Sequence, residues 1–550
     1  MRLTDTSDLW WKTAVVYCLD VETFMDWNDD GVGDFEGLAH RLDYLAELGV
    51  TCLWLMPFHP SPQQDDGYDV SDFYSIDRRY GHLGDFVEVV RTARDRGMRV
   101  IADLVVNHTS DRHPWFLAAK SSRKSPYRDF YVWRDEPPKE QPAPVFPGEQ
   151  DGVWELDEKS GQYYLHNFYK HQPDLNMANP KVRDEIAKVI GFWLELGLDG
   201  FRVDAVPYFV APDEVDGPHS FLRELARYIS RRRGDAILLG EVNLPYEQQL
   251  DYFGGPDGDQ LSMQFDFVGM QRMFLSLARE DATPLAEALA ARPPLAPENQ
   301  WANFVRNHDE LTLDKLSEEE REEVFDAFAP EERMRVYGRG IVRRLAPMLG
   351  GDPRRLRLVY SLLFSLPGTP VLYYGEELGM GEELSAGGRA SVRNAMQWNP
   401  TEHGGFSNAR RRRLAPHVTQ GGFGPEHVNA SQQRHDPDSM LNFIRRLIER
   451  YRASAEIGWG ELRMLDSGDP AVLAHSVHGA EGRMIAVHNF SAEPRTIRLR
   501  LDDVDESTRL VDLLAEGSRN PDAAGVVEVE LGAYGFHWLR VLGAADKRLS

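Results

Sequence analysis

Acidic residues follow apolar, strand-like runs at three widely separated places in this chain. Asp204 lies in one such run, Glu241 follows a second, and Asp309 lies just past a third. Two carboxylates in one pocket can cleave a glycosidic bond, one as the nucleophile and the other as the proton donor. The fold that this chemistry requires must therefore bring the three acids together.

The run Leu198–Val206 contains a charge pair. Arg202 and Asp204 are two residues apart, so on a strand their side chains point to the same face. A neighbouring guanidinium favours the ionised carboxylate, which suits a nucleophile; the alternative is a structural salt bridge. Glu241 follows an apolar run and has no adjacent cation in the sequence, so we predict that it has a raised pKa and is the general acid and base.

Eight short apolar runs alternate with longer helical patterns, which is typical of parallel β/α units. The runs are Ala14–Leu19, Cys52–Pro57, Arg99–Val106, Gly200–Val206, Ala236–Val242, Gln264–Phe267, Trp301–Asn307 and Pro370–Tyr374. Apolar residues recur at spacings of three and four between them, as in Leu38–Leu48, Asp85–Arg96 and Arg183–Leu196. Eight β/α units predict an α/β fold, a (β/α)8 TIM barrel.

In such a barrel the carboxyl ends of the strands meet at one mouth. Asp204, Glu241 and Asp309 should therefore face one another, with His108 and His308 beside them. Three acids and two imidazoles in one pocket favour a catalytic site over a structural cluster.

Two further segments differ from the barrel pattern. Residues 109–180 are rich in Pro, Tyr, Trp and Asp and lack helical periodicity, so we expect an inserted domain after strand three that walls one side of the site. Residues 457–550 contain short alternating runs separated by turn residues, which predicts a C-terminal antiparallel β-sandwich. Residues 1–108 and 181–456 are then assigned to the barrel.

Composition excludes some classes of partner. The formal net charge of −26 disfavours nucleic acids and anionic membranes, which need a basic face. No apolar run is long enough to span a bilayer, and the first residues do not resemble a signal peptide. The two cysteines lie in apolar runs and are interpreted as buried thiols. We expect a cytoplasmic protein; a homo-oligomer is compatible with the sequence.

The segment Asp26–Asp34 places oxygen-bearing side chains at alternate positions around a glycine. A loop of this kind wraps a hard cation, whereas the alternative is a polar turn satisfied by its own backbone. Like-charged neighbours at this spacing are costly without a cation. The pattern therefore favours metal binding.

Four segments at the ends of predicted strands contain His108, Asp204, Glu241 and Asp309. Together with His171–Asn176, they resemble in order and spacing the signature segments of the α-amylase superfamily of retaining glycoside hydrolases (family thirteen). Within that superfamily the chain is most similar to trehalose synthases and to the oligo-1,6-glucosidase and α-glucosidase group. The resemblance implies that Asp204 is the nucleophile, that Glu241 is the acid/base, and that Asp309 holds and distorts the reacting glucose. It also implies that Asp103 bonds Arg202.

The resemblance implies a set of sugar-binding residues as well. These are Asp65, Tyr68, His108, Arg202, His308 and Arg393, with Tyr68 stacking on the glucose and Asp65 pairing with Arg393 to close the pocket floor. A closed floor favours short α-glucosides over internal attack on starch. The implied metal ligands, for Ca²⁺ or Mg²⁺, are Asp26, Asn28, Asp30, the Val32 carbonyl and Asp34.

Some positions depart from the trehalose-synthase pattern. Ala211 stands where many of those enzymes have a glutamate for a second metal site, so we do not expect that site to be fully formed. Asn394-Ala395 replaces a Thr-Pro. Hydrolysis, transfer and isomerisation share one glycosyl-enzyme and differ in whether water or a retained sugar attacks it.

We therefore predict a retaining enzyme that cleaves short α-glucosides through a β-glucosyl ester on Asp204 and hydrolyses them, with transglycosylation also open to it. One alternative is a trehalose synthase, which isomerises maltose and trehalose by intramolecular transfer. Another is a non-catalytic scaffold or transporter-associated subunit, which would need a missing carboxylate or a membrane helix; the sequence shows neither.

Overall fold

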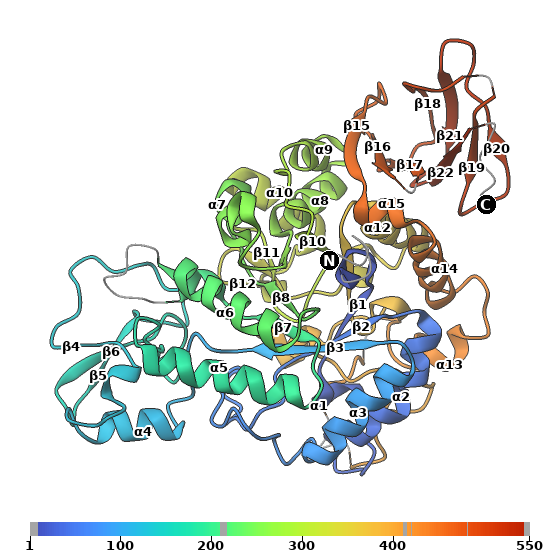
Figure 1. Cartoon of the computed structure of the whole chain (residues 1–550). Coiled ribbons are helices and arrows are strands. Elements are labelled where there is room, and N and C mark those ends of the chain that lie inside the picture. Colours follow the sequence, from blue (N-terminus) through green and yellow to red (C-terminus); the bar gives the residue numbers. More distant parts are fainter. Residues whose placement is uncertain are drawn as a thin grey trace.

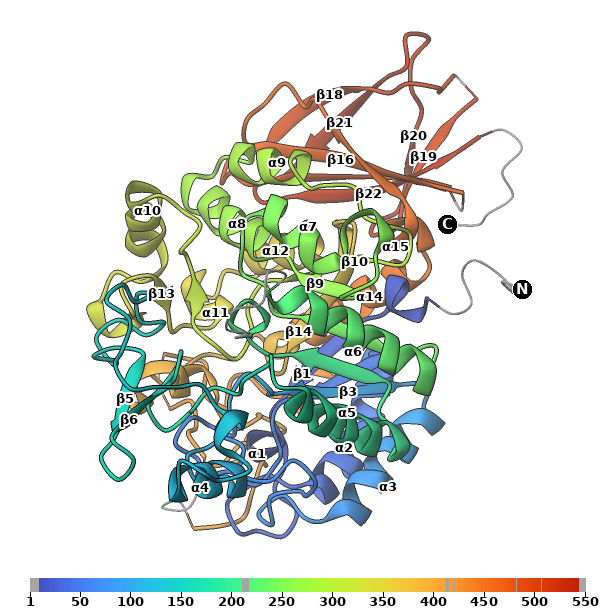
Figure 2. The ribbon, with the colours of Figure 1, turned by 60° about the vertical axis from the view of Figure 1, so that its left-hand side comes forward.

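A closed barrel of eight parallel strands forms the centre of the computed structural model, which describes residues 9–209, 217–410, 415–419, 421–480, 482–505 and 507–543. The strands are β1 (Val16–Leu19), β2 (Cys52–Leu55), β3 (Arg99–Leu104), β7 (Gly200–Val203), β8 (Ile237–Gly240), β9 (Met263–Phe265), β10 (Gln300–Phe304) and β14 (Thr369–Tyr373). They pair in the order β1-β14-β10-β9-β8-β7-β3-β2, as Figures 1 and 2 show from two sides. The predicted barrel and all eight of its predicted strands are confirmed.

Most of the helices surround the barrel. They are α1 (Val21–Phe24), α2 (Phe35–Leu48), α3 (Leu83–Asp95), α5 (Pro180–Glu195), α6 (Pro218–Arg232), α7 (Tyr246–Phe253), α8 (Phe267–Arg279), α9 (Thr283–Ala290), α10 (Glu318–Phe328), α11 (Leu345–Met348), α12 (Pro353–Ser365), α13 (Ala430–Gln433), α14 (Met440–Arg452) and α15 (Ala455–Trp459). In α2, Leu38, Leu42 and Leu45 recur at helical spacing and are buried. The helix begins at its N-cap Asp34 and ends before Gly49, whose φ of 98° suits glycine.

Several strands end earlier than their apolar runs predict. The predicted run to Val206 ends as a strand at Val203, and Asp204 begins a turn. The backbone N–H of Asp204 still donates to the Leu104 carbonyl at 3.2 Å, while Ala205 takes a left-handed conformation with φ 48°. This turn places Asp204 at the rim of the barrel rather than inside it.

The inserted segment forms a small sheet after β3. Strands β4 (Trp133–Arg134), β6 (Gln162–Leu165) and β5 (Trp154–Asp157) pair antiparallel in that order, and α4 (Pro114–Ser121) lies beside them. Val132, Val153 and Leu165 make its own small core. Asn107 fastens this segment to the barrel, because its amide donates to Asp174 at 3.2 Å. The proposed bounds of 109–180 stay a prediction.

Two antiparallel sheets form the C-terminal region, at the top right of Figure 1. One contains β15 (Glu461–Leu465), β16 (Val472–Gly479), β17 (Gly482–Asn489), β22 (Phe536–Leu542), β19 (Arg509–Asp512) and β20 (Ser518–Arg519) in that order, and the other pairs β18 (Arg495–Arg500) with β21 (Val526–Leu531). Ile485, Leu499 and Val529 belong to the core between the two sheets. The predicted sandwich is confirmed.

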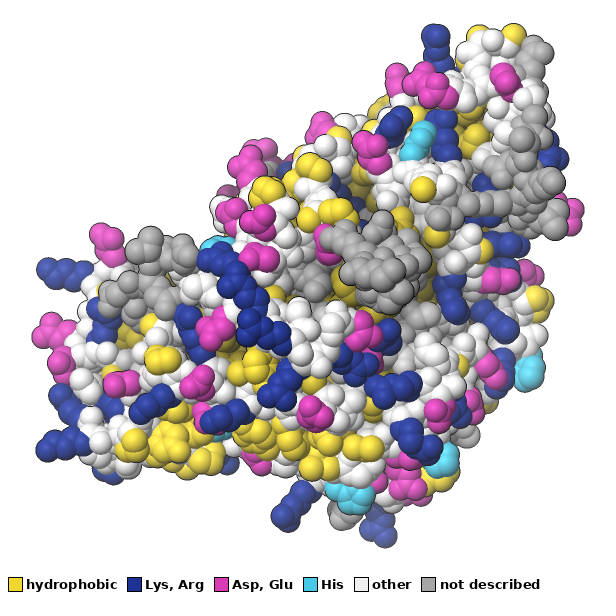
Figure 3. Space-filling view, viewed as in Figure 1, with side chains coloured by type: hydrophobic (Ala, Val, Ile, Leu, Met, Phe, Trp, Pro, Cys, Tyr) yellow, Lys and Arg dark blue, Asp and Glu magenta, His cyan; other side chains and the backbone are white. Residues whose placement is uncertain are grey.

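Figure 3 shows acidic and basic side chains interspersed on one face, with basic ones gathered over α6. Cys18 and Cys52 are buried and free, as predicted. Among the described residues, no helix is long and apolar enough to cross a membrane.

Candidate active site

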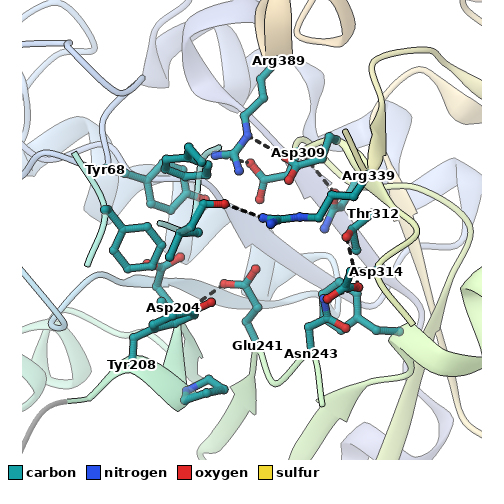
Figure 4. Close-up of a pocket in the computed structure, with 18 of the residues that line it drawn as sticks. Tyr68, Asp204, Tyr208, Glu241, Asn243, Asp309, Thr312, Asp314, Arg339 and Arg389 are labelled. Atoms are coloured by element: carbon teal, nitrogen blue, oxygen red, sulfur yellow. Dashed lines mark hydrogen bonds and ion pairs between the residues drawn. The ribbon is translucent and has the colours of Figure 1, made fainter. Parts of the chain in front are cut away.

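A cavity of about 270 Å³ opens at the carboxyl ends of the barrel strands. Its lining residues are Asp65, Tyr68, His108, Val145, Phe146, Phe168, Asp204, Ala205, Pro207, Tyr208, Glu241, Asn243, Leu244, Phe267, Asn307, Asp309, Glu310, Thr312, Asp314, Lys315, Arg339 and Arg389. Figure 4 shows Asp204, Glu241 and Asp309 around the same space. The predicted convergence of the three acids is therefore present in the structure.

Arg202 connects two of these acids. From β7, its Nη2 donates to Glu241 Oε2 at 2.8 Å and its Nη1 donates to Asp204 Oδ1. The same Nη1 also donates to Asp103 Oδ1 at 2.6 Å, which confirms the expected bond to Asp103. Glu241 has no adjacent cation in the sequence, but the fold supplies one, because Arg202 reaches both carboxylates from the neighbouring strand.

Burial nevertheless raises the pKa of both carboxyl groups. Burial is the largest influence on Glu241 and raises its pKa to about 7, although Arg202 opposes the shift. Burial also raises the pKa of Asp204, to about 6, again against the pull of Arg202. Near pH 7 Asp204 is thus mostly ionised, while Glu241 is protonated in about half of the molecules. This is the division of roles that a nucleophile and a general acid need.

Asp309 has a different environment. Its Oδ1 lies 3.1 Å from Arg389 Nη1 and accepts from Arg393 Nη2 at 2.9 Å. Burial alone would raise the pKa of Asp309, but Arg389 and Arg393 hold it well below its usual range. This carboxylate therefore stays ionised and can only accept hydrogen bonds, which suits contact with sugar hydroxyls.

Two histidines adjoin Tyr68. The Tyr68 hydroxyl lies 2.7 Å from His308 Nε2, and His108 Nε2 lies 3.0 Å from the Tyr68 carbonyl. Burial lowers the pKa of His108 to about 4, and it also lowers the pKa of His308 well below its ordinary value. Both imidazoles are therefore neutral at pH 7. The pair therefore orients Tyr68 and presents neutral hydrogen-bonding groups.

The pocket floor corrects one predicted ion pair. Arg393 Nη1 pairs with Asp66, whereas Asp65 accepts from Gln172 Nε2 at 2.8 Å. Both acids lie in the same tight turn, and Asp66 takes a left-handed φ of 50°. The turn brings Asp66 to the guanidinium and leaves Asp65 on the cavity wall. Arg393 therefore pairs with the acid next to the predicted one, and the closed floor stays a prediction.

The predicted sugar-binding residues divide into two groups. Asp65, Tyr68 and His108 line the cavity with the three acids. Arg202, His308 and Arg393 do not line it; each is bonded to a residue that does. His308 Nε2 lies 3.2 Å from Asp309 Oδ2 and 2.7 Å from the Tyr68 hydroxyl, and its contact with the sugar stays a prediction.

Other residues that line the cavity were not predicted from the sequence, among them Asn243, Thr312, Asp314 and Arg339. Asn243 donates to Asp314 Oδ1 at 3.0 Å, and Thr312 Oγ1 donates to the same oxygen at 3.2 Å. Arg339 Nη2 donates to the Val145 carbonyl at 2.7 Å, which ties the barrel side to the inserted segment. Asn243 could have been found, because it is two residues past Glu241 and faces the same side. Arg339 lies in a loop without a periodic pattern.

The loop Asp26–Asp34, which follows β1 and the short helix α1, lies outside the cavity. Asp34 caps α2, Asp30 and Asn28 accept from backbone N–H groups of the loop, and Asp26 Oδ2 accepts from Gly31 at 2.8 Å. Among the described residues, no three His, Cys, Asp or Glu side chains lie close enough to hold a metal ion. Asp26 Oδ1, however, is buried without a partner. Ala211, at the questioned second metal site, lies outside the described residues.

Paired carboxylates at the mouth of a (β/α)8 barrel define a carbohydrate-active enzyme of the glycoside hydrolase class. The α-amylase catalytic-domain model matches residues 20–328 and 342–460, and a sucrose hydrolase-like C-terminal domain model matches residues 482–540. The chain belongs to the α-amylase family.

Relatives extend this result. A trehalose synthase of Thermus thermophilus is 42% identical over 96% of this chain, which spans 55% of that protein. A trehalose synthase/amylase of Mycobacterium tuberculosis is 39% identical over 97% of this chain and 90% of its own length. A glucan 1,6-alpha-glucosidase of Streptococcus pneumoniae is 32% identical over 89% of this chain and 92% of its own. The structure of an alpha-amylase from H. orenii superposes with a TM-score of 0.78 at 26% identity, covering 96% of this chain and 99% of that one.

Proposed function

We propose that this protein is a retaining enzyme of short α-glucosides with Asp204 as nucleophile and Glu241 as acid and base. The observation that carries the proposal is the shared bond to Arg202, which holds one mostly ionised and one half-protonated carboxyl group at the same cavity. Carboxyl groups with raised pKa values that face one cavity are typical of catalytic sites.

The first half-reaction follows from the two protonation states. Asp204 attacks the anomeric carbon while Glu241 gives its proton to the leaving oxygen, and a β-glucosyl ester forms on Asp204. Asp309 accepts hydrogen bonds from the hydroxyls of the reacting glucose. In the second half-reaction, the Glu241 carboxylate takes a proton from the attacking hydroxyl and the ester is released.

We further propose that the attacking group is the released glucose, so that the enzyme converts maltose and trehalose into one another. The relatives named trehalose synthases at about 40% identity over nearly the whole chain support this reaction. Asn243, Thr312 and Asp314 offer hydrogen bonds beyond the carboxylates, where a retained sugar would lie. Hydrolysis by water is the second candidate, and the glucosidase relative supports it.

Product analysis tests both reactions. The enzyme is incubated with maltose, and separately with trehalose, and the sugars are separated. Formation of each disaccharide from the other supports isomerisation, glucose alone supports hydrolysis, and longer sugars indicate intermolecular transfer. Asp204→Asn should keep the fold and retain less than about a hundredth of the activity. Higher activity in this variant would remove Asp204 as the nucleophile.

We also propose that the loop after β1 binds Ca²⁺ or Mg²⁺. Asp26, Asn28, Asp30, the Val32 carbonyl and Asp34 would hold the ion after their side chains turn toward it, because in the structure Asp26, Asp30 and Asp34 accept from backbone N–H groups instead. The buried free oxygen of Asp26 supports this set. A cation here would neutralise the loop and stabilise its fold without taking part in the reaction. The cytoplasmic location, the oligomeric state and the absence of nucleic-acid partners stay predictions.

A further inference from the structure

Arg389 is a second arginine on Asp309, and it comes from a segment without a periodic sequence pattern. It lies in the 3-10 helix Gly388–Val392, four residues before Arg393. Its Nη1 is 3.1 Å from Asp309 Oδ1, and its Nε donates to Glu310 Oε2 at 2.8 Å. Figure 4 shows it on the cavity wall beside Asp309.

The two arginines on Asp309 are held in different ways. Arg393 is held by the backbone of the barrel, because its Nε donates to the His308 carbonyl at 2.9 Å, and its side chain is only 5% exposed. The side chain of Arg389 is 19% exposed, and its guanidinium also contacts two aromatic rings. Its guanidinium carbon lies 4.8 Å from the ring centre of Phe146 and 5.8 Å from that of Tyr337.

Phe146 belongs to the inserted segment, whereas Arg389 and Asp309 belong to the barrel. Phe146 is held over the cavity by Tyr169, whose ring centre is 4.7 Å away, and by Tyr337 at 5.0 Å. An aromatic face over a guanidinium attracts it and keeps water away from it. A less hydrated cation interacts more strongly with a nearby carboxylate.

We propose that Arg389 is a positioning residue that couples the packing of the inserted domain, through Phe146, to the placement of Asp309. When Phe146 covers Arg389, the guanidinium keeps Asp309 in contact with the reacting glucose, and water is excluded from the cavity. When this cover is lost, the hold on Asp309 loosens and water reaches the glucosyl-enzyme. Arg389 and Phe146 thus set the ratio of hydrolysis to isomerisation; this inference rests on the proposed function.

The test compares product ratios in three variants of the full chain, with maltose as substrate. Phe146→Leu removes the aromatic face without touching Asp309, and Arg389→Gln removes the cation. Both should raise the ratio of glucose to trehalose about threefold to tenfold, as loss of a partly buried cation–π contact predicts. Arg389→Lys keeps the charge and should restore part of the wild-type ratio. For all three, KM and kcat are measured separately, because a general loss of fold would lower kcat without changing the ratio.

Arg354→Gln is the matched control. Arg354 also pairs with a carboxylate, Asp352 at 2.8 Å, and lies 5.6 Å from a ring, Tyr534, but it is outside the cavity. Its product ratio should equal that of the wild type. An unchanged ratio in folded Phe146→Leu and Arg389→Gln, or an equal change in the control, overturns the role of Arg389. A wild-type enzyme that yields only glucose contradicts the isomerisation proposal itself.

Discussion

At the scale of single residues, one guanidinium organises the chemistry. Arg202 bonds Asp103, Asp204 and Glu241 at once, so a buried cation is balanced by carboxylates rather than left alone. Burial still raises the pKa of both reacting groups, and raises that of Glu241 higher. Asp309 has two arginines of its own and stays ionised. The three acids therefore have three different protonation behaviours within one cavity.

These protonation states predict a narrow, bell-shaped pH dependence. kcat/KM for maltose should fall below about pH 6, where Asp204 gains a proton, and above about pH 7, where Glu241 loses one. The two limbs belong to the coupled pair. With glucosyl fluoride, whose leaving group needs no proton, Glu241→Gln should lose the alkaline limb. An alkaline limb that persists in this variant would assign it to another group.

At the scale of elements, loops between strands and helices complete the site. The turn after β2 selects Asp66 rather than Asp65 as the partner of Arg393. The loop after β1 ends in the N-cap of α2, so its conformation and the start of that helix depend on each other. Loops of this kind tolerate changes that leave the barrel supporting them intact.

The loop after β1 gives a stability prediction. Ca²⁺ at about 100 times its Kd should stabilise the fold by about 2.7 kcal/mol, so Tm should rise with Ca²⁺ and fall with a chelator. Asp26→Asn should abolish this response. Asp352→Ala, which removes the N-cap side chain of α12 instead, should lower Tm and leave the Ca²⁺ response intact. A wild-type Tm that ignores both Ca²⁺ and chelator would contradict the metal site.

At the scale of the whole molecule, the C-terminal sandwich is joined to the barrel through α12. His488 Nε2 lies 2.9 Å from Ser361 Oγ, and His475 Nε2 lies 3.0 Å from the Ser365 carbonyl. The two imidazole rings are stacked 6.3 Å apart and fully buried. The junction is therefore built around two histidines that have no room for water.

This junction should weaken in acid. Burial lowers the pKa of His475 to about 4, while an unfolded histidine titrates near 6.5. Its contribution to stability is therefore full above about pH 6.5 and is lost as the pH falls toward 4, by up to about 3 kcal/mol. Calorimetry should show a steeper acid loss of Tm in the wild type than in His475→Gln. The exposed His427 serves as the control, and His427→Gln should follow the wild type.

Sequence patterns predicted the barrel and the meeting of Asp204, Glu241 and Asp309, because the strand period and the barrel mouth place them without knowledge of any loop. Contacts made by loops were harder to predict. Adjacent acids such as Asp65 and Asp66 differ only in their positions within one turn, where Asp66 alone takes a left-handed conformation. Arg389 and Phe146 meet across two segments that lack periodicity, so no local pattern indicates their contact.

The covalent intermediate gives the most direct test of the central claim. Glu241→Gln is mixed with glucosyl fluoride, so that the ester forms but its release is slow. The protein is digested at low pH and analysed by mass spectrometry. We expect one hexosyl group on the peptide that contains Asp204, and none when Asp204 is also replaced by Asn. A hexosyl group on another residue, or active enzyme that never acquires one, would contradict it.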